Sequence, residues 1–214
     1  MPQRPQAVLE PRKSPVQARS AASVDAILDA TLQVLLQVGK ERLTTTKVAL
    51  RAGVSVGTLY QYFPNKSSLL KAVLRRHLDK VLEAVERVCR EQTGQPLEQM
   101  ATALITAFLE AKMKDAKTSV ALYAISSDVD GAKIAQENGI RSNQAVAGML
   151  RTASQPLTTD PELVASMLQA VMVGVSRRLL ESTAPEKQVG AVSQELIFLA
   201  RTYLNASSAG PSNR

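Results

Sequence analysis

The chain has almost no cysteine or histidine and no tryptophan among its 214 residues. Its single cysteine, Cys89, cannot form an internal disulfide, and with His77 as the only histidine it cannot build the usual Cys/His zinc site. The sequence also lacks a glycine-rich phosphate loop and any carboxylate spacing typical of an acid–base pair. We therefore expect no metal, no cofactor and no enzymatic activity.

Long apolar runs are missing too. No segment approaches the roughly 18 uninterrupted apolar residues that a bilayer needs, and no apolar segment of a secretory signal follows the first residues. Apolar residues make up 45% of the chain and charged residues 21%. This composition predicts a soluble, cytoplasmic protein without a membrane partner.

Acidic residues are scarce in the first part of the chain. Residues 1–80 contain thirteen Lys and Arg against five Asp and Glu, a net charge of +8, whereas residues 81–214 contain thirteen against fourteen, a net charge of −1. A merely solvated surface would spread its charge more evenly. The basic N-terminal part indicates a polyanionic partner such as DNA.

The first helices follow from apolar periodicity and capping residues. Apolar residues at steps of three and four predict a helix that ends near Gly39. Thr44 and Ser55 are good N-cap residues for two short helices, the second ending near Phe63. A long apolar stripe predicts a fourth helix that follows Asn65 and ends at about residue 91.

Turn sequences divide the rest of the chain into helix-length segments, and no strand pattern or internal repeat interrupts them. We expect further helices at about 97–113, 117–129, 132–153, 161–183 and 186–205. The predicted fold class is all-α, with about nine helices. The predicted divisions are a disordered basic arm (1–19), a three-helix domain (20–66), a larger helical domain (67–205) and a disordered tail (206–214).

Aromatic side chains gather at one point: Tyr60, Tyr62 and Phe63 fall within four residues, although the chain has only seven aromatics. A helix of about seven residues is not stable alone. Val54, Leu59 and Phe63 must therefore hold it against its neighbours, which leaves the opposite face free. This pattern favours a helix-turn-helix whose last helix enters the major groove of DNA.

The segment from Thr44 to Lys66, TTTKVALRAGVSVGTLYQYFPNK, resembles the TetR family of transcriptional repressors, and the resemblance extends over residues 20–75. It implies a homodimer that binds a palindromic double-stranded operator and is released from it by a small-molecule effector. An alternative from another class is an all-helical ligand-binding or assembly protein whose basic N-terminal domain does not read DNA.

The resemblance also implies DNA contacts. The residues expected to touch phosphates are Thr44, Thr45, Tyr62 and Lys66. Ser55, the N-cap of the helix that enters the major groove, belongs to the same predicted DNA-binding set. Those expected nearest the bases are Val56, Gly57, Thr58, Tyr60 and Gln61. Val56 departs from the polar or basic residue more frequent in the family, so we expect only apolar contact with a thymine methyl there.

Lys66 has a physical argument of its own. In the first turn of a helix capped by Asn65 it faces the positive end of the helix dipole, a conflict that a bound phosphate would relieve. The alternative is an exposed lysine without a role. The same two interpretations apply to the arm residues Arg4, Arg12, Lys13 and Arg19, which either contact DNA or do nothing specific.

The two last predicted helices carry apolar faces suited to a four-helix bundle between two subunits, as the resemblance implies. The predicted dimer-interface residues are Leu168, Val171, Gly174, Val175, Val192, Leu196 and Leu199. The alternative for all of them is ordinary core within one chain.

An effector pocket is harder to recognise. Flexible, polarisable methionines suit an adaptable apolar cavity. The candidate lining residues are Leu104, Phe108, Met113, Tyr123, Met149, Met167 and Met172. Because aromatics are few, an aromatic cage for a cation is disfavoured, and we expect a small apolar effector that is neutral or anionic. His77 and Cys89 are predicted to be structural, with Cys89 mostly buried.

Overall fold

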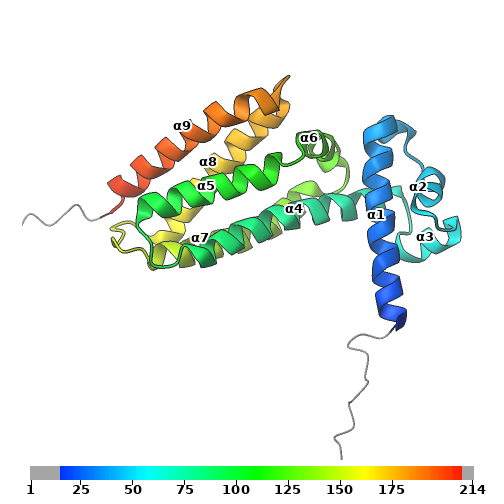
Figure 1. The fold of residues 1–214 in the computed structure, drawn as a ribbon, viewed down its shortest axis with the longest axis horizontal. Coiled ribbons are helices and arrows are strands. Elements are labelled where there is room, and N and C mark those ends of the chain that lie inside the picture. The colour runs from blue at the N-terminus through cyan, green and yellow to red at the C-terminus, as the bar shows by residue number, and fades with distance from the viewer. Residues whose placement is uncertain (1–14, 209–214) are drawn as a thin grey trace, which may run out of the picture. The chain divides into compact units, whose positions relative to one another are not determined.

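The computed structural model describes residues 15–208, and these contain nine α-helices, one 3-10 turn and no β-strand (Figure 1). The all-α prediction is confirmed. The helices are α1 (Pro15–Arg42), α2 (Thr45–Ala52), α3 (Val56–Tyr62), α4 (Lys66–Glu91), α5 (Leu97–Met113), α6 (Ala116–Ile125), α7 (Gly131–Arg151), α8 (Pro161–Glu181) and α9 (Pro185–Ala206), with the 3-10 turn at Ser126–Asp128. The described residues form two compact units, divided between residues 69 and 70.

The ends of the chain differ from the expected arm and tail. Helix α1 begins at Pro15, so residues 15–19 of the predicted arm are helical, while residues 1–14 and 209–214 lie outside the described residues. Gly39, with φ at +76°, breaks the helical conformation where the sequence predicted the end of the first helix. Ser207 accepts a backbone hydrogen bond of 2.8 Å from Thr158, so the described structure runs past the predicted start of the tail.

The N-terminal unit holds three helices around a small core. Ile27 of α1, Val48 of α2 and Leu59 of α3 are all fully buried, and Phe63 after α3 is 9% exposed. Outside this core, Arg51 of α2 donates to Gln33 of α1 over 2.6 Å. The seven-residue α3 is thus stabilised by burial rather than by its own length.

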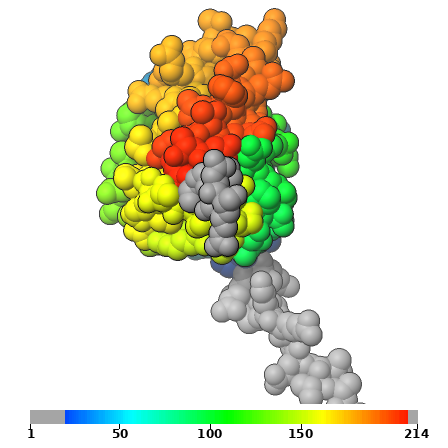
Figure 2. Space-filling view, turned by 90° about the vertical axis from the view of Figure 1, so that its left-hand side faces the viewer, coloured from blue at the N-terminus to red at the C-terminus, as the bar shows by residue number. Residues whose placement is uncertain are grey.

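The C-terminal unit packs its helices around a single apolar core to which α4, α5, α7, α8 and α9 contribute. Helix α5 packs along α9, and α7 packs along α8 (Figure 1). At the end of the unit the last turns of α9, red in Figure 2, lie beside α5, shown in green. There Arg201 and Asn205 of α9 both donate to the carboxylate of Glu98 on α5.

Helix α8 is apolar on more than one face. By length and composition alone, it and the segment Ser20–Arg42 would be long and apolar enough to cross a membrane. On α8, however, Val164 and Leu168 are buried in the core, while Met167 and Val173 are 48% and 51% exposed. The apolar composition of α8 therefore comes from a core face together with a second, uncovered face.

Candidate DNA-binding and ligand sites

Helices α2 and α3 are joined by a tight turn with capping at both helix starts. The Thr44 hydroxyl accepts from the Lys47 backbone N–H over 3.2 Å, and the Ser55 hydroxyl accepts from the Thr58 N–H over 2.9 Å. Gly53 ends α2 in the left-handed conformation, at φ +69°, which glycine adopts without a steric cost. The two N-caps predicted from the sequence are confirmed, and α2 and α3 form a helix-turn-helix.

The outer face of α3 is open. Leu59 points into the core, whereas Val56 is 37% exposed and Gly57 and Gln61 are also exposed. A side chain at Gly57 would meet only the Ser55 hydroxyl, at 3.7 Å, so no packing demands glycine there. Of the five predicted base-reading residues, all except the half-buried Thr58 are thus exposed on α3.

Two predicted DNA contacts bind each other. The hydroxyls of Thr45 and Tyr60 lie 3.1 Å apart, which links the start of α2 to α3. Tyr60 is nevertheless 48% exposed, and Tyr62 and Thr58 are half-buried. Tyr60 therefore positions α3 as well as facing outward.

The structure revises the physical argument for Lys66. Asn65 does cap α4, because its side-chain oxygen accepts from the Ser68 N–H over 2.8 Å. The Lys66 ammonium, however, is half-buried and donates to the Lys40 carbonyl oxygen at 2.5 Å, within the same unit. A bound phosphate is therefore not needed to explain this lysine, which has a structural partner in the last turns of α1.

The predicted effector residues are not gathered around one cavity. Leu104, Phe108, Met149 and Met172 are packed in the apolar core of the C-terminal unit. Met113 is half-buried, Met167 lies on the uncovered face of α8, and the Tyr123 hydroxyl donates to Glu181 over 2.9 Å. For most of them, packing in the core accounts for their apolar character.

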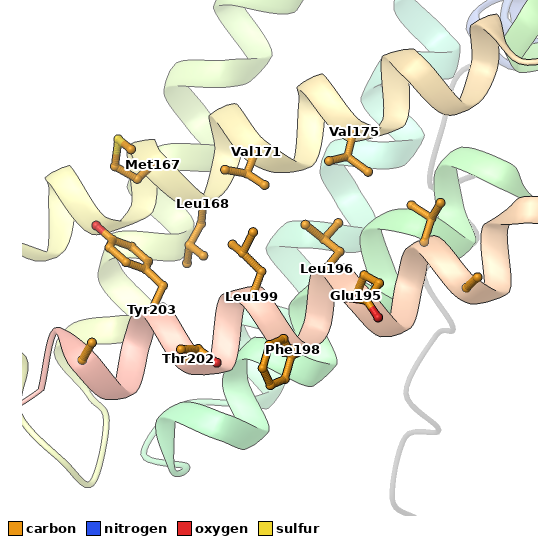
Figure 3. A pocket seen from close by; sticks show the side chains of 13 residues that line it. Met167, Leu168, Val171, Val175, Glu195, Leu196, Phe198, Leu199, Thr202 and Tyr203 are labelled. Atoms are coloured by element: carbon orange, nitrogen blue, oxygen red, sulfur yellow. The ribbon is translucent and has the colours of Figure 1, made fainter.

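A groove of about 880 Å³ runs between the outer faces of α8 and α9. In Figure 3, Met167, Val171 and Val175 of α8 face Leu199 and Tyr203 of α9 across it. Glu195 is the only charged side chain in its lining. A groove so apolar, on the surface of one chain, is typical of an interface.

Six of the seven predicted dimer residues line this groove, and two of these six also belong to the core. The groove lining includes Leu168, Val171, Val175, Val192, Leu196 and Leu199. Leu168 and Leu196 are only 2% and 3% exposed and belong to the core, whereas Leu199 is 45% exposed and Gly174 is also exposed. Sequence reasoning missed Phe198, which is 68% exposed beside Leu199 and lines the same groove.

A second cavity, of about 560 Å³, lies between α4 and α7 and escaped sequence reasoning. Its lining mixes charged residues such as Glu86, Arg90 and Arg141 with the buried Cys89 and Met149. Burial raises the pKa of the Cys89 thiol to about 12, which leaves it protonated at neutral pH. The predicted burial of Cys89 is confirmed.

His77 also has a partner that its sequence position did not reveal. Its Nε2 lies 3.2 Å from the Ser119 hydroxyl oxygen of α6. Ser119 in turn donates to the Lys112 carbonyl oxygen at 2.5 Å, so its oxygen accepts from the imidazole N–H. Burial, followed by the charges of Lys112 and Lys80, lowers the pKa of His77 to about 4. The ring is therefore neutral and is held by a structural hydrogen bond.

Comparison with known proteins was consistent with this geometry. Residues 27–73 match the family described as "Bacterial regulatory proteins, tetR family", and residues 96–204, half of the chain, match "Tetracyclin repressor-like, C-terminal domain". The transcriptional repressor KstR of Mycolicibacterium smegmatis is 44% identical over 61 residues, 28% of this chain and 30% of that protein. The matched segments span between 26% and 53% of the length of the curated relatives.

Solved structures share the fold over most of the chain. A TetR-family transcriptional regulator from Mesorhizobium loti has a TM-score of 0.72 at 19% identity, covering 89% of this chain and 99% of that one. SmeT, in its complex with triclosan, has a TM-score of 0.64 at 24% identity, covering 89% and 93%. With family matches to both its N-terminal and its C-terminal parts, the chain belongs to the TetR family of bacterial regulatory proteins.

Proposed function

We propose that the protein is a sequence-specific transcriptional regulator, a repressor that leaves its operator when a small-molecule effector binds. The observation that carries this proposal is the open face of α3. Val56, Gly57 and Gln61 are exposed on it, and Leu59 is the only residue of this helix that is fully buried. Major-groove readers place such a helix against base edges. The net charge of +8 on residues 1–80 supplies attraction to phosphates.

The direct test is a DNA-protection footprint with the full chain on the DNA upstream of its own gene. A protected, two-fold symmetric site is expected. A protein that protects no site, and that binds all sequences equally, would favour the alternative of a helical ligand-binding or assembly protein. The proposed setting is the cytoplasm, and the proposal assigns the protein no enzymatic activity.

Gln61 and Lys66 are expected to act differently on DNA. The Gln61 amide is free to pair with an adenine edge, so Gln61→Ala should cost about 1–3 kcal/mol on the best operator and relax preference at one base pair per half-site. On DNA, Lys66 is expected to exchange its Lys40 partner for a phosphate. Lys66→Ala should then weaken binding to all DNA sequences alike. It should also reduce the slope of log affinity against log salt concentration by about one for each phosphate that is no longer neutralised.

Affinities for single-base operator variants at several salt concentrations measure both effects. Because Lys66 also holds the end of α1, circular dichroism must show that its variant is folded. If Gln61→Ala leaves affinity and base preference unchanged, α3 does not read bases as proposed.

The effector response requires that a ligand bind the DNA-competent and relaxed states with different affinity. A coupling of about 1–3 kcal/mol is typical, and it would lower operator affinity roughly 5- to 150-fold. The complex of the structurally similar SmeT with triclosan supports small-molecule binding by this fold. The check is operator affinity, with and without saturating ligand, for each apolar compound found to bind. Tight binders that never change operator affinity would contradict the mechanism.

The proposed oligomer is a two-fold dimer through α8 and α9. Two helices of about 21 residues extend roughly 30 Å each, long enough for an interface of standard size. A second copy would cover the groove with the same apolar side chains, as an isologous four-helix bundle does. This arrangement accounts for the uncovered apolar face of α8.

A further inference from the structure

The cavity between α4 and α7 combines an apolar floor with a charged rim. Cys89 and Met149 are 4% and 3% exposed and form its floor, while Arg90 and Arg141 are exposed at its rim. Its volume, about 560 Å³, lies within the range of small-molecule sites. All of its lining belongs to the C-terminal unit.

The rim carries an unbalanced positive charge. Arg141 of α7 donates to the Glu86 carboxylate of α4 over 2.8 Å. Arg90, the third charged residue of the lining, forms no ion pair within the described part of the chain. Two guanidinium groups against one carboxylate leave a net charge of +1, which one monoanion would neutralise.

Gly148 keeps the cavity open. It lies inside α7 with an ordinary helical φ, and an added Cβ would meet nothing within 4 Å. Neither the backbone conformation nor close packing therefore requires glycine, although glycine weakens the interior of a helix. Because Gly148 lines the cavity, a side chain at this position would take up space inside it.

We propose that this cavity binds an amphiphilic carboxylate, with its head group between Arg90 and Arg141 and its apolar chain over Cys89 and Met149. A carboxylate suits the planar donors of arginine and carries the single negative charge that the rim lacks. The inference deepens the proposed function by naming an effector class and a site. Binding of the carboxylate does not depend on the proposed function, but its role as an effector rests on it.

Titration calorimetry of the full chain with octanoate tests the site, with 1-octanol as the uncharged comparison. Octanoate is expected to bind with one molecule per chain and at least tenfold more tightly than octanol. Arg90→Gln should weaken octanoate at least tenfold. Arg87→Gln is the matched control, because Arg87 pairs with Glu91 on the same helix and does not line the cavity; it should leave octanoate binding unchanged.

Gly148→Leu should abolish octanoate binding without lowering the melting temperature. Gly148→Ala provides a second test that cannot fail through misfolding: it should raise the melting temperature and weaken octanoate several-fold. The site is overturned if octanoate gives no saturable heat at millimolar concentration, if octanol binds as tightly, or if the Arg90 and Gly148 variants bind octanoate like the unaltered protein. The calorimetry is carried out without DNA, so a negative result for octanoate does not bear on the footprint test of the proposed regulator.

Discussion

Replacing Phe198 and Leu199 together by aspartate is expected to convert the proposed dimer into a folded monomer. The two side chains are 68% and 45% exposed in the single chain and line the α8–α9 groove. In the proposed dimer each copy would bury two unpaired carboxylates, and each buried polar group without a partner costs about 1–3 kcal/mol or more. Four such groups across a two-fold interface should weaken dimerisation by at least about 4 kcal/mol, roughly a thousandfold.

Light scattering at micromolar concentration measures the mass of each variant, and circular dichroism shows whether it is folded. Ile140→Asp is the matched control, because Ile140 on α7 is 55% exposed but does not line the groove. Leu196 is unsuitable for this test, since it is 3% exposed and an aspartate there would disrupt the core itself. A monomeric unaltered protein, or a double variant that stays dimeric, would contradict the proposed interface.

The sequence predicts the helices well because their signals are local. Thr44, Ser55 and Asn65 each cap the helix that follows them, and the hydrogen bonds of these caps lie within three residues along the chain. The turn sequence that ends at Pro96 likewise placed the predicted helix at the observed bounds of α5, Leu97–Met113. The exception is the start of α1, where residues 15–19 are helical although the sequence predicted a disordered arm there.

The sites are less predictable because they depend on contacts between distant segments. Lys66 is near Lys40, and His77 is near Ser119, 42 residues away, and no periodicity announces either pair. The predicted effector pocket stays a prediction, because a methionine such as Met172, which is buried, looks the same in sequence whether it lines a cavity or fills a core. A cavity of mixed polarity, such as the one between α4 and α7, carries even less local signal.

The burial of His77 should make the protein sensitive to mild acid. The folded pKa is about 4 against 6.5 for an unperturbed histidine, a lowering caused first by burial and then by Lys112 and Lys80, with Asp115 opposing it. Above about pH 6.5 the ring is neutral in both the folded and unfolded chain, so pH has no effect through it. As pH falls from 6.5 towards 4 only the unfolded chain takes up the proton, and the free energy of unfolding decreases.

With His77→Gln this loss should disappear. A glutamine amide can still donate to the Ser119 oxygen but does not titrate, so the variant isolates the proton from the hydrogen bond. At about 1.4 kcal/mol per pKa unit, discounted because the ring is partly exposed, the unaltered protein should lose about 2–3 kcal/mol more than the variant between pH 7 and pH 4. Urea unfolding at fixed protein concentration, followed by circular dichroism, measures the difference.

Carboxylates whose pKa is lowered by hydrogen bonds, such as Glu98 and Glu137, also reduce stability in acid, but they do so in both proteins, so their contributions cancel in the comparison. Parallel pH dependence of the two proteins would show that His77 becomes protonated without unfolding its surroundings.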